Sequence, residues 1–251
     1  MLTKVLEVEA GDIISLVGAG GKTSTMFRLA QELKQRSQDK IITTTTTKIL
    51  KPSSTETEKL IIGRDLTVLI DKINREEASL VTIAKELTSN GKLSGIDPDW
   101  INRLTDLDTT IIVEADGAAC KDFKIPNQQE PILPSKTDLL LPVIGSRIVG
   151  KDLTPQNLHR ASLLRKINPQ LHLGQPITVE IIVEILLNDS GYSLLNQQQN
   201  YRVIPLINQV DTPLRYDFAL KMAKRLVKAG IEKVVLTAVK SKKPVVKVVK
   251  S

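Results

Sequence analysis

The chain has 251 residues, of which 41% are hydrophobic and 25% charged, the composition of a globular protein with a substantial apolar core. No apolar run reaches the length of a membrane span, and the N-terminus lacks the charged-then-apolar plan of a signal peptide. The single cysteine, Cys120, excludes an internal disulfide framework, and the two histidines, His159 and His172, exclude a histidine-rich metal site. We therefore expect a cytoplasmic protein without a membrane segment.

The net charge of +7 is concentrated near the C-terminus. Without the five lysines of the last twelve residues the remaining charge is +2; these are Lys240, Lys242, Lys243, Lys247 and Lys250. We interpret residues 241–251 as a solvated basic tail, with contact to nucleic acid or to an acidic partner as the alternative. The aromatic content of 3% provides few platforms for base stacking, which argues against nucleic acid.

The first elements form a strand–loop–helix unit. Residues 12–17 predict a strand, and residues 22–36 predict a helix. A second strand begins at Ile41 and runs into the threonines 43–47, because β-branched residues favour extended backbone. The threonine hydroxyls could also contact phosphate or metal-bound water, while an ordinary strand end is the alternative.

The middle of the chain continues the alternation of strands and helices. Strands are predicted at residues 60–62, 79–84, 109–113 and 139–144, and helices are predicted to begin at Asp97-Pro98 and at Thr154-Pro155. The uninterrupted apolar run of 109–113 is typical of a parallel strand that is covered on both faces. Residues 124–133 are expected to form a loop, because three prolines in or beside this segment prevent regular pairing.

The last third repeats the pattern. It predicts a helix after Pro176 with Thr178 as its cap, a polar connection at 196–200, a strand at 201–208, a helix at 212–229 and a strand at 233–238. Strands that alternate with helices predict an α/β protein, here a three-layer P-loop NTPase-like fold with a mainly parallel sheet. We expect one domain over residues 1–240, with a phosphate-binding half at 1–150 and a C-terminal half at 151–240.

A glycine-rich corner joins the first strand to the first helix. Backbone amides, the positive end of the helix dipole and a lysine at such a corner bind phosphate. The predicted nucleotide-binding residues of this corner are Gly18, Ala19, Gly20, Gly21, Lys22, Thr23 and Ser24. A full Walker A motif requires glycine where Leu16 stands, so the loop is shorter and resembles that of Mur-type and folylpolyglutamate ligases.

Two carboxylates close the apolar strand at 109–113. Glu114 and Asp116 share one side of an extended chain, about 7 Å apart. A carboxylate at this strand end holds Mg²⁺ or orients water in nucleotide-hydrolysing proteins, and Thr23 supplies a hydroxyl ligand. We assign Glu114 and Thr23 to the metal and Asp116 to water or substrate, with the two carboxylates interchangeable. Together with Lys22 they form the predicted catalytic set; turn chemistry at Asp116-Gly117 is the alternative.

A second pair of strand ends suggests contact with a nucleobase. Asn208-Gln209-Val210-Asp211, followed by Thr237-Ala238-Val239-Lys240, resembles the N-K-x-D and S-A-K motifs of GTP-binding proteins, in the same order. Asn208 and Asp211 are therefore predicted nucleotide contacts. Gln209 replaces the motif's lysine, so the match is partial and a helix-capping turn is the alternative. ATP and GTP both remain candidates.

Several segments in order across residues 12–160 resemble the YqeC family. They are residues 18–23, 43–47, 113–118, 124–126, 130–134, 143–145 and 159–160. The family is described as accessory to selenium-dependent molybdenum hydroxylases or as acting in selenium cofactor biosynthesis. Gln129 stands where the family pattern is expected to have histidine, which removes histidine chemistry at that point.

The resemblance implies a biological setting. We expect a Mg²⁺-dependent protein that binds ATP or GTP and hydrolyses it as an accessory factor in that selenium pathway. A molybdenum hydroxylase or a selenium-donor protein is the implied partner. The alternative is a non-catalytic module that binds an anion or cofactor and docks a partner enzyme.

Overall fold

The computed structural model describes residues 1–195 and 200–251; most of the polar connection predicted at 196–200 lies outside the described residues. The chain forms two compact units that are interleaved along the sequence and do not follow the halves 1–150 and 151–240. The first unit comprises Met1–Leu16, Thr23–Gly117 and Ile132–Leu140, and the second comprises Val17–Lys22, Ala118–Pro131 and Leu141–Ser251. Strands β1 (Ile13–Gly18) and β10 (Leu139–Gly145) begin in the first unit and end in the second.

The first unit is built on parallel strands. Their order is β10-β1-β8-β2-β5-β4, and the pairs β1–β8, β8–β2, β2–β5 and β5–β4 are all parallel. The remaining strands have the bounds Ile41–Thr45 (β2), Lys59–Ile62 (β4), Leu80–Ala84 (β5) and Thr110–Glu114 (β8). The central strands β1, β2, β5 and β8 are buried along their whole length, as the apolar run at 109–113 predicts for β8.

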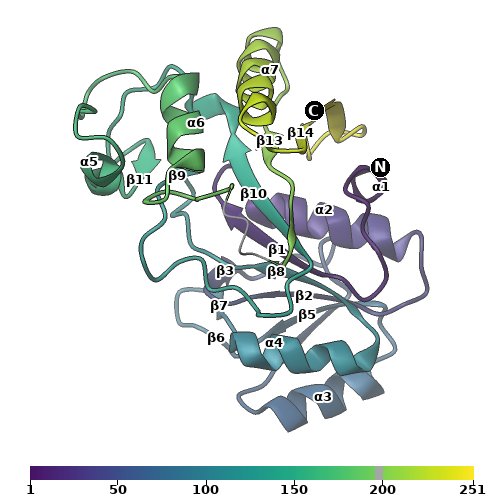
Figure 1. Cartoon of the computed structure of the whole chain (residues 1–251). Helices are drawn as coiled ribbons and strands as arrows, with labels where there is room; N and C mark the ends of the chain where they lie inside the picture. Colours follow the sequence, from purple (N-terminus) through teal and green to yellow (C-terminus); the bar gives the residue numbers. More distant parts are fainter. Residues whose placement is uncertain (196–199) are drawn as a thin grey trace. The chain divides into compact units, whose positions relative to one another are not determined.

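Helices cover both faces of these strands. The helices of the unit are α1 (Leu2–Val5), α2 (Lys22–Lys34), α3 (Leu66–Arg75) and α4 (Pro98–Leu104). Helix α2 leads from β1 to β2, whereas α4 leads back from β5 to β8, so right-handed crossovers place them on opposite faces. Figure 1 shows α2 above the strands and α3 and α4 below them. The first unit therefore has the three layers of the predicted α/β fold.

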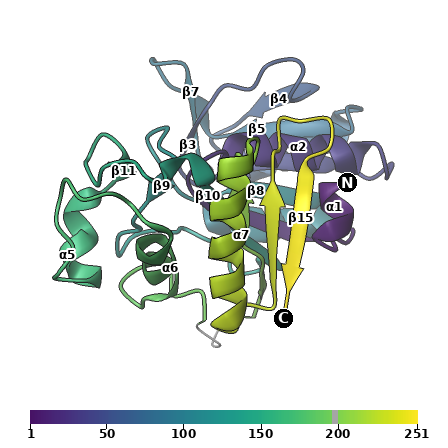
Figure 2. The same ribbon diagram turned by 90° about the horizontal axis from the view of Figure 1, so that it is seen from above.

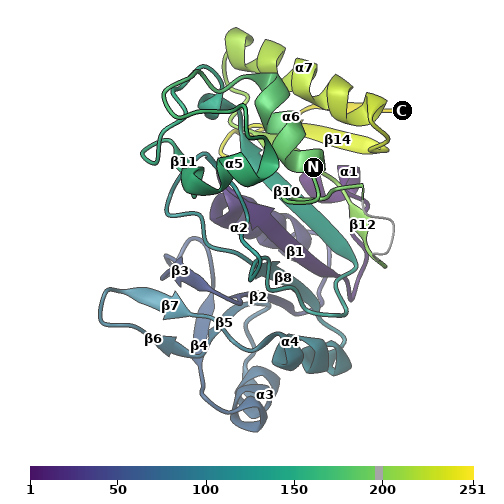
Figure 3. The same cartoon turned by 60° about the vertical axis from the view of Figure 1, so that its left-hand side comes forward.

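A small antiparallel sheet of three strands, which the sequence did not predict, is attached to the first unit. Its order is β3-β7-β6, with the bounds Lys48–Leu50 (β3), Glu86–Leu87 (β6) and Lys92–Ser94 (β7). Figure 3 shows these strands together beside β4. The three strands have only two or three residues each, which is too few for an alternating pattern to be visible in the sequence.

The second unit continues from the shared strands. Its strand order is β15-β14-β13-β10-β1, where β10, β13 and β14 run parallel and β15 is antiparallel to β14. The remaining bounds are Phe123–Lys124 (β9), Leu158–His159 (β11), Arg202–Val203 (β12), Leu206–Asn208 (β13), Lys233–Thr237 (β14), Val245–Lys250 (β15), Leu164–Ile167 (α5), Val179–Leu187 (α6) and Pro213–Lys228 (α7).

Helices α6 and α7 pack on each other and enclose the core of this unit with its strands. Figure 2 shows α7 beside β14 and β15, with α6 next to it. Both helices begin as predicted, because Thr178 and Thr212 each accept a hydrogen bond from the backbone amide three residues later. Within the described residues, no helix combines the length and the apolar character needed to cross a bilayer.

Two predictions for the second unit are wrong. No helix begins at Thr154-Pro155: the amides of Asn157 and Leu158 donate to the Thr154 carbonyl in a turn, and β11 follows and pairs with β9. The Thr-Pro signal forms only a single turn there, and the short helical elements η3 (Ala161–Leu163) and α5 begin after β11. The last residues form β15 rather than a solvated tail, because its four valines are β-branched and favour extended backbone.

Two further boundaries differ from the prediction. The expected loop at 124–133 begins inside β9, and the strand expected at 201–208 is divided into β12 and β13. The division falls at Ile204-Pro205, where proline has no amide hydrogen for the strand ladder.

A candidate phosphate-binding site

The glycine-rich loop packs against backbone with no space for side chains. Gly18 has φ +93°, and a Cβ atom there would lie 2.4 Å from the Val143 carbonyl oxygen. Gly20 has φ +89°, and its Cβ would lie 2.3 Å from the amide nitrogen of Gly145. Glycine alone combines these left-handed dihedral angles with such close backbone approach. The loop is therefore held in one shape by the end of β10.

Asn208 fixes the loop from the end of β13. Its side-chain amide donates to the Gly20 carbonyl at 2.9 Å, and a Cβ on Gly21 would lie only 2.4 Å from that amide nitrogen. The side-chain oxygen of Asn208 accepts from the Thr237 hydroxyl at 3.1 Å and from the Val239 amide at 3.2 Å. A buried amide with its donor and acceptor both used is a positioning group. In this structure Asn208 therefore ties the loop to the end of β14.

Lys22 lies over the loop that precedes it. Its ammonium donates to the Gly18 carbonyl at 2.7 Å, and the side chain is buried. The amides of Ala19 and Gly20 donate to the carbonyls of Val143 and Lys121 at 2.8 and 3.0 Å. The first amides of helix α2 lie at a helix N-terminus and are therefore the candidates for contact with an anion.

In the first unit the predicted metal residues Thr23 and Glu114 lie in direct contact. The Thr23 hydroxyl donates to Glu114 Oε2 at 2.6 Å. Glu114 is the last residue of β8 and is buried, and the Thr45 hydroxyl donates to its backbone carbonyl at 2.7 Å. A hydroxyl and a carboxylate are the oxygen ligands that Mg²⁺ prefers. The pair therefore has the chemistry that Mg²⁺ requires of protein ligands.

Asp116 and the threonine run have different surroundings. Asp116 is 1% exposed and lies two residues beyond β8. Thr43 shares a 2.7 Å hydrogen bond with the Thr82 hydroxyl, and Thr44 donates to the Ile83 carbonyl at 2.9 Å. These two hydroxyls bind the neighbouring strand, which favours the strand-end interpretation over phosphate contact. The described residues contain no group of three or more His, Cys, Asp or Glu that could hold a metal ion.

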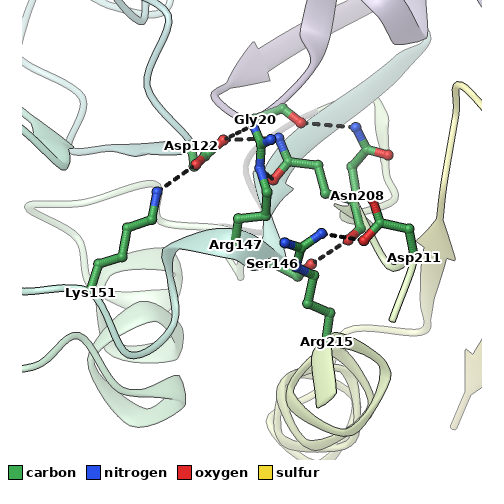
Figure 4. Close-up of polar contacts among 9 residues, drawn as sticks. Gly20, Asp122, Ser146, Arg147, Lys151, Asn208, Asp211 and Arg215 are labelled. Atoms are coloured by element: carbon green, nitrogen blue, oxygen red, sulfur yellow. Dashed lines mark hydrogen bonds and ion pairs between the residues drawn. The ribbon is translucent and has the colours of Figure 1, made fainter. Parts of the chain in front are cut away.

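The proposed base-contact residues are occupied by protein partners. Asp211 forms an ion pair with Arg215 one turn along α7, and Figure 4 shows the two side chains pointing toward each other. The amide of Ala238, which would meet a guanine carbonyl in the S-A-K motif, donates to the Pro244 carbonyl at 2.8 Å. Base contact by Asp211 therefore remains a prediction.

A polar cluster of Asp122, Arg147, Lys151 and Gln209, which the sequence did not predict, lies beside the loop. Asp122 accepts hydrogen bonds from Gln209 Nε2 at 2.9 Å, from Arg147 at 2.9 Å and from Lys151 at 3.1 Å (Figure 4). Arg147 Nε also donates to Gln209 Oε1 at 3.0 Å. Burial raises the pKa of the Asp122 carboxyl, but the bonds from Gln209, Arg147 and Lys151 outweigh it and hold that pKa below its usual range. Asp122, Gln209 and the pair Arg147 and Lys151 are far apart in sequence, so no spacing pattern indicates the cluster.

The proline-containing segment after β9 carries a buried ion triplet. Glu130 Oε2 accepts from Lys124 at 2.5 Å and from Arg160 at 2.7 Å, and the Lys124 side chain is fully buried. Burial raises the pKa of the Glu130 carboxyl, but Arg160 and Lys124 outweigh it and lower the pKa to about 2. The two cations of this triplet come from β9 and from the residue after β11, so the triplet holds the loop to both strands.

The strand, the closed glycine loop and the helix that opens with Lys22-Thr23 define an α/β protein of the P-loop NTPase-like class. The YqeC family model, described as "YqeC protein", matches residues 14–162, and the chain belongs to this family.

The proteins to which the chain is similar include a curated relative and a solved structure. "Uncharacterized protein YqeC" of Escherichia coli (strain K12) is 33% identical over 152 residues, which are 60% of this chain and 58% of that protein. The match therefore spans somewhat more than half the length of this curated relative. Chloroplast FtsY from Physcomitrella patens superposes with a TM-score of 0.41 at 13% identity, over 95% of this chain and 63% of that structure. The structural similarity at that level implies no shared function.

Proposed function

We propose that the chain binds a nucleoside triphosphate with Mg²⁺ through residues 18–24 and hydrolyses it. The observation that carries this proposal is the loop itself. Three glycines, Gly18, Gly20 and Gly21, pack against backbone atoms and the Asn208 side chain with no space for a Cβ atom, and Lys22 follows directly. A rigid glycine loop before a helix N-terminus and a lysine is the arrangement that binds the phosphates of a nucleotide.

The roles of the individual groups follow from their chemistry. Lys22 would exchange its bond to the Gly18 carbonyl for the terminal phosphates, since an ammonium prefers a charged acceptor. The next residue, Thr23, would hold Mg²⁺ together with Glu114, and the bound ion would neutralise charge on the phosphate oxygens. Asp116 would orient the attacking water as a buried carboxylate.

The proposed setting comes from the family resemblance. We propose that nucleotide hydrolysis serves selenium cofactor biosynthesis or the maturation of selenium-dependent molybdenum hydroxylases, with such a hydroxylase or a selenium-donor protein as the partner. Incorporation of labelled selenium into the hydroxylase, in cells that carry wild type or Lys22→Ala, tests this setting. Equal incorporation in both would remove the link to selenium.

The binding experiment compares ATP, GTP, ADP and GDP with and without Mg²⁺ by calorimetry. Wild type should bind a triphosphate in the presence of Mg²⁺ and release phosphate on incubation. Lys22→Ala should lose binding, while Lys224→Ala, which removes an exposed lysine on α7, should retain it. Retained affinity in Lys22→Ala would contradict the proposal. Binding without turnover would instead select the non-catalytic module.

A further inference from the structure

We propose that Arg147 contacts the terminal phosphate of the bound nucleotide, so that this side chain distinguishes triphosphate from diphosphate. The proposal rests on the proposed function of the glycine loop and assigns one further residue to it. All the residues that carry it belong to the second unit: the loop at Gly20, Gly145 at the end of β10, and the cluster of Asp122, Arg147 and Gln209.

The cluster and the loop touch at Gly145. A Cβ atom built on Gly145 would lie 2.6 Å from Gln209 Oε1 and 3.0 Å from the Cα atom of Gly20. Gly145 therefore leaves space in which the glycine loop and Gln209 approach each other closely. Since Gln209 Oε1 is the atom that accepts from Arg147 Nε at 3.0 Å, the guanidinium is held next to the loop.

Two backbone hydrogen bonds also hold the cluster next to the glycine loop. The amide of Gly20 donates to the Lys121 carbonyl at 3.0 Å, and the amide of Gly145 donates to the Asp122 carbonyl at 2.9 Å. The carboxylate that holds Arg147 thus follows directly on a residue bonded to the loop. Figure 4 shows the Arg147 side chain pointing toward Asp122, with Gly20 close by.

Arg147 has unused capacity for an anion. A guanidinium carries five N–H groups, and Arg147 uses one on Gln209 and one on Asp122. Its side chain is 49% exposed, so the remaining donors are accessible to a ligand.

The cluster also has surplus positive charge. Arg147 and Lys151 both bind the one carboxylate of Asp122, whose lowered pKa keeps it charged, so the group has a net charge of +1. A surplus cation with free donors, oriented beside a phosphate loop, matches the planar recognition of phosphate oxygens by arginine. Gln209 has φ +66°, a costly backbone conformation for a non-glycine residue. In this conformation its side chain is hydrogen-bonded to both Arg147 and Asp122.

The test measures the affinities of wild type, Arg147→Ala and Lys151→Ala for triphosphate and diphosphate forms of the preferred nucleotide, with Mg²⁺ at fixed ionic strength. Arg147→Ala should weaken triphosphate binding about tenfold or more, and diphosphate binding less than about twofold, because one charged hydrogen-bonding group is lost. Lys151→Ala is the matched control. It removes a cation from the same carboxylate, but Lys151 binds the other oxygen and reaches Asp122 from the side opposite Arg147 (Figure 4). Because Lys151 adds to the charge of the cluster without contacting the phosphate, Lys151→Ala should weaken both nucleotides and change the ratio of the two affinities by less than about twofold.

The variant Asp122→Asn distinguishes a phosphate contact by Arg147 from a purely structural role of its ion pair with Asp122. If Arg147 only braces the segment at Asp122, Arg147→Ala and Asp122→Asn will weaken both nucleotides equally, and that result overturns the inference. An unchanged ratio in Arg147→Ala also overturns it. Absence of any nucleotide binding by wild type would instead refute the proposed function, so the two failures are distinguishable.

Discussion

Replacement of Gly20 by alanine should destabilise the second unit far more than replacement of Gly150. Both glycines have left-handed backbone, with φ +89° and φ +85°. A Cβ on Gly20 would lie 2.3 Å from the nitrogen and 2.4 Å from the Cα of Gly145, whereas a Cβ on Gly150 would meet nothing within 4 Å. The pair therefore separates the conformational cost of alanine from the cost of a steric clash with backbone.

The magnitudes follow from these two costs. Left-handed backbone costs an alanine roughly 1–2 kcal/mol, and this cost applies to both variants. Insertion of a methyl group into a closely packed region adds about 1–3 kcal/mol, and it applies to Gly20→Ala alone. Alanine also restricts the unfolded chain by a similar amount in both variants, so this effect cancels in the comparison. Gly20→Ala should lower the free energy of unfolding by about 1–3 kcal/mol more than Gly150→Ala.

Urea unfolding followed by far-ultraviolet circular dichroism measures this difference. The slope of unfolding free energy against urea should stay constant between the variants, so that the midpoints report stability. Equal midpoints for Gly20→Ala and Gly150→Ala would show that the loop can accommodate a side chain. In that case the closed geometry on which phosphate binding rests would be refuted.

Three other predictions concern single side chains. Glu114→Gln should abolish the Mg²⁺ dependence of nucleotide binding in calorimetry, because a neutral amide replaces the carboxylate that accepts from Thr23; unchanged Mg²⁺ dependence would remove Glu114 from the metal site. Asn208→Asp should weaken nucleotide binding more than its loss of stability explains, because a carboxylate oxygen would face the Gly20 carbonyl; affinity equal to wild type would exclude a positioning role. The pKa of Glu130 is lowered to about 2, so its ion triplet should stabilise the fold above about pH 4.5 and lose that contribution as the pH falls toward 2. In unfolding experiments Glu130→Gln should lack this acid-dependent loss of stability. A variant whose stability depends on pH as that of wild type does would contradict the prediction.

The elements that the sequence predicts well are those whose predictive residues lie in or directly beside the element itself. Helix α7 begins at Thr212-Pro213 and ends just before Gly230, with cap, proline and glycine in the expected positions. The apolar run at 109–113 predicts a buried parallel strand, and β8 pairs in parallel with β1 on one side and β2 on the other. The glycine loop is a local motif as well. These parts needed no knowledge of distant contacts.

The elements that were missed depend on partners far along the chain. Strands β9 and β11 pair residues 123–124 with residues 158–159, and neither segment has a strand pattern of its own. Asp122, Arg147 and Gln209 meet only because three strand ends or loops converge. Helix α3 is the exception, since Asp65 caps it and its buried residues Leu66, Leu69 and Ile73 follow helical spacing. That signal was present in the sequence and could have found the helix.

Strand β15 also affects how the protein behaves in solution. Among the strands of residues 1–195 and 200–251 it lies at the end of the strand order of the second unit, so one row of its backbone hydrogen-bonding groups faces no further strand of that sheet. Lys247 and Lys250 are exposed along it. A second copy that approached this edge would bring lysines close to lysines, and natural sheets use such charges to discourage edge-to-edge pairing. The same residues that complete the sheet thus protect it against aggregation.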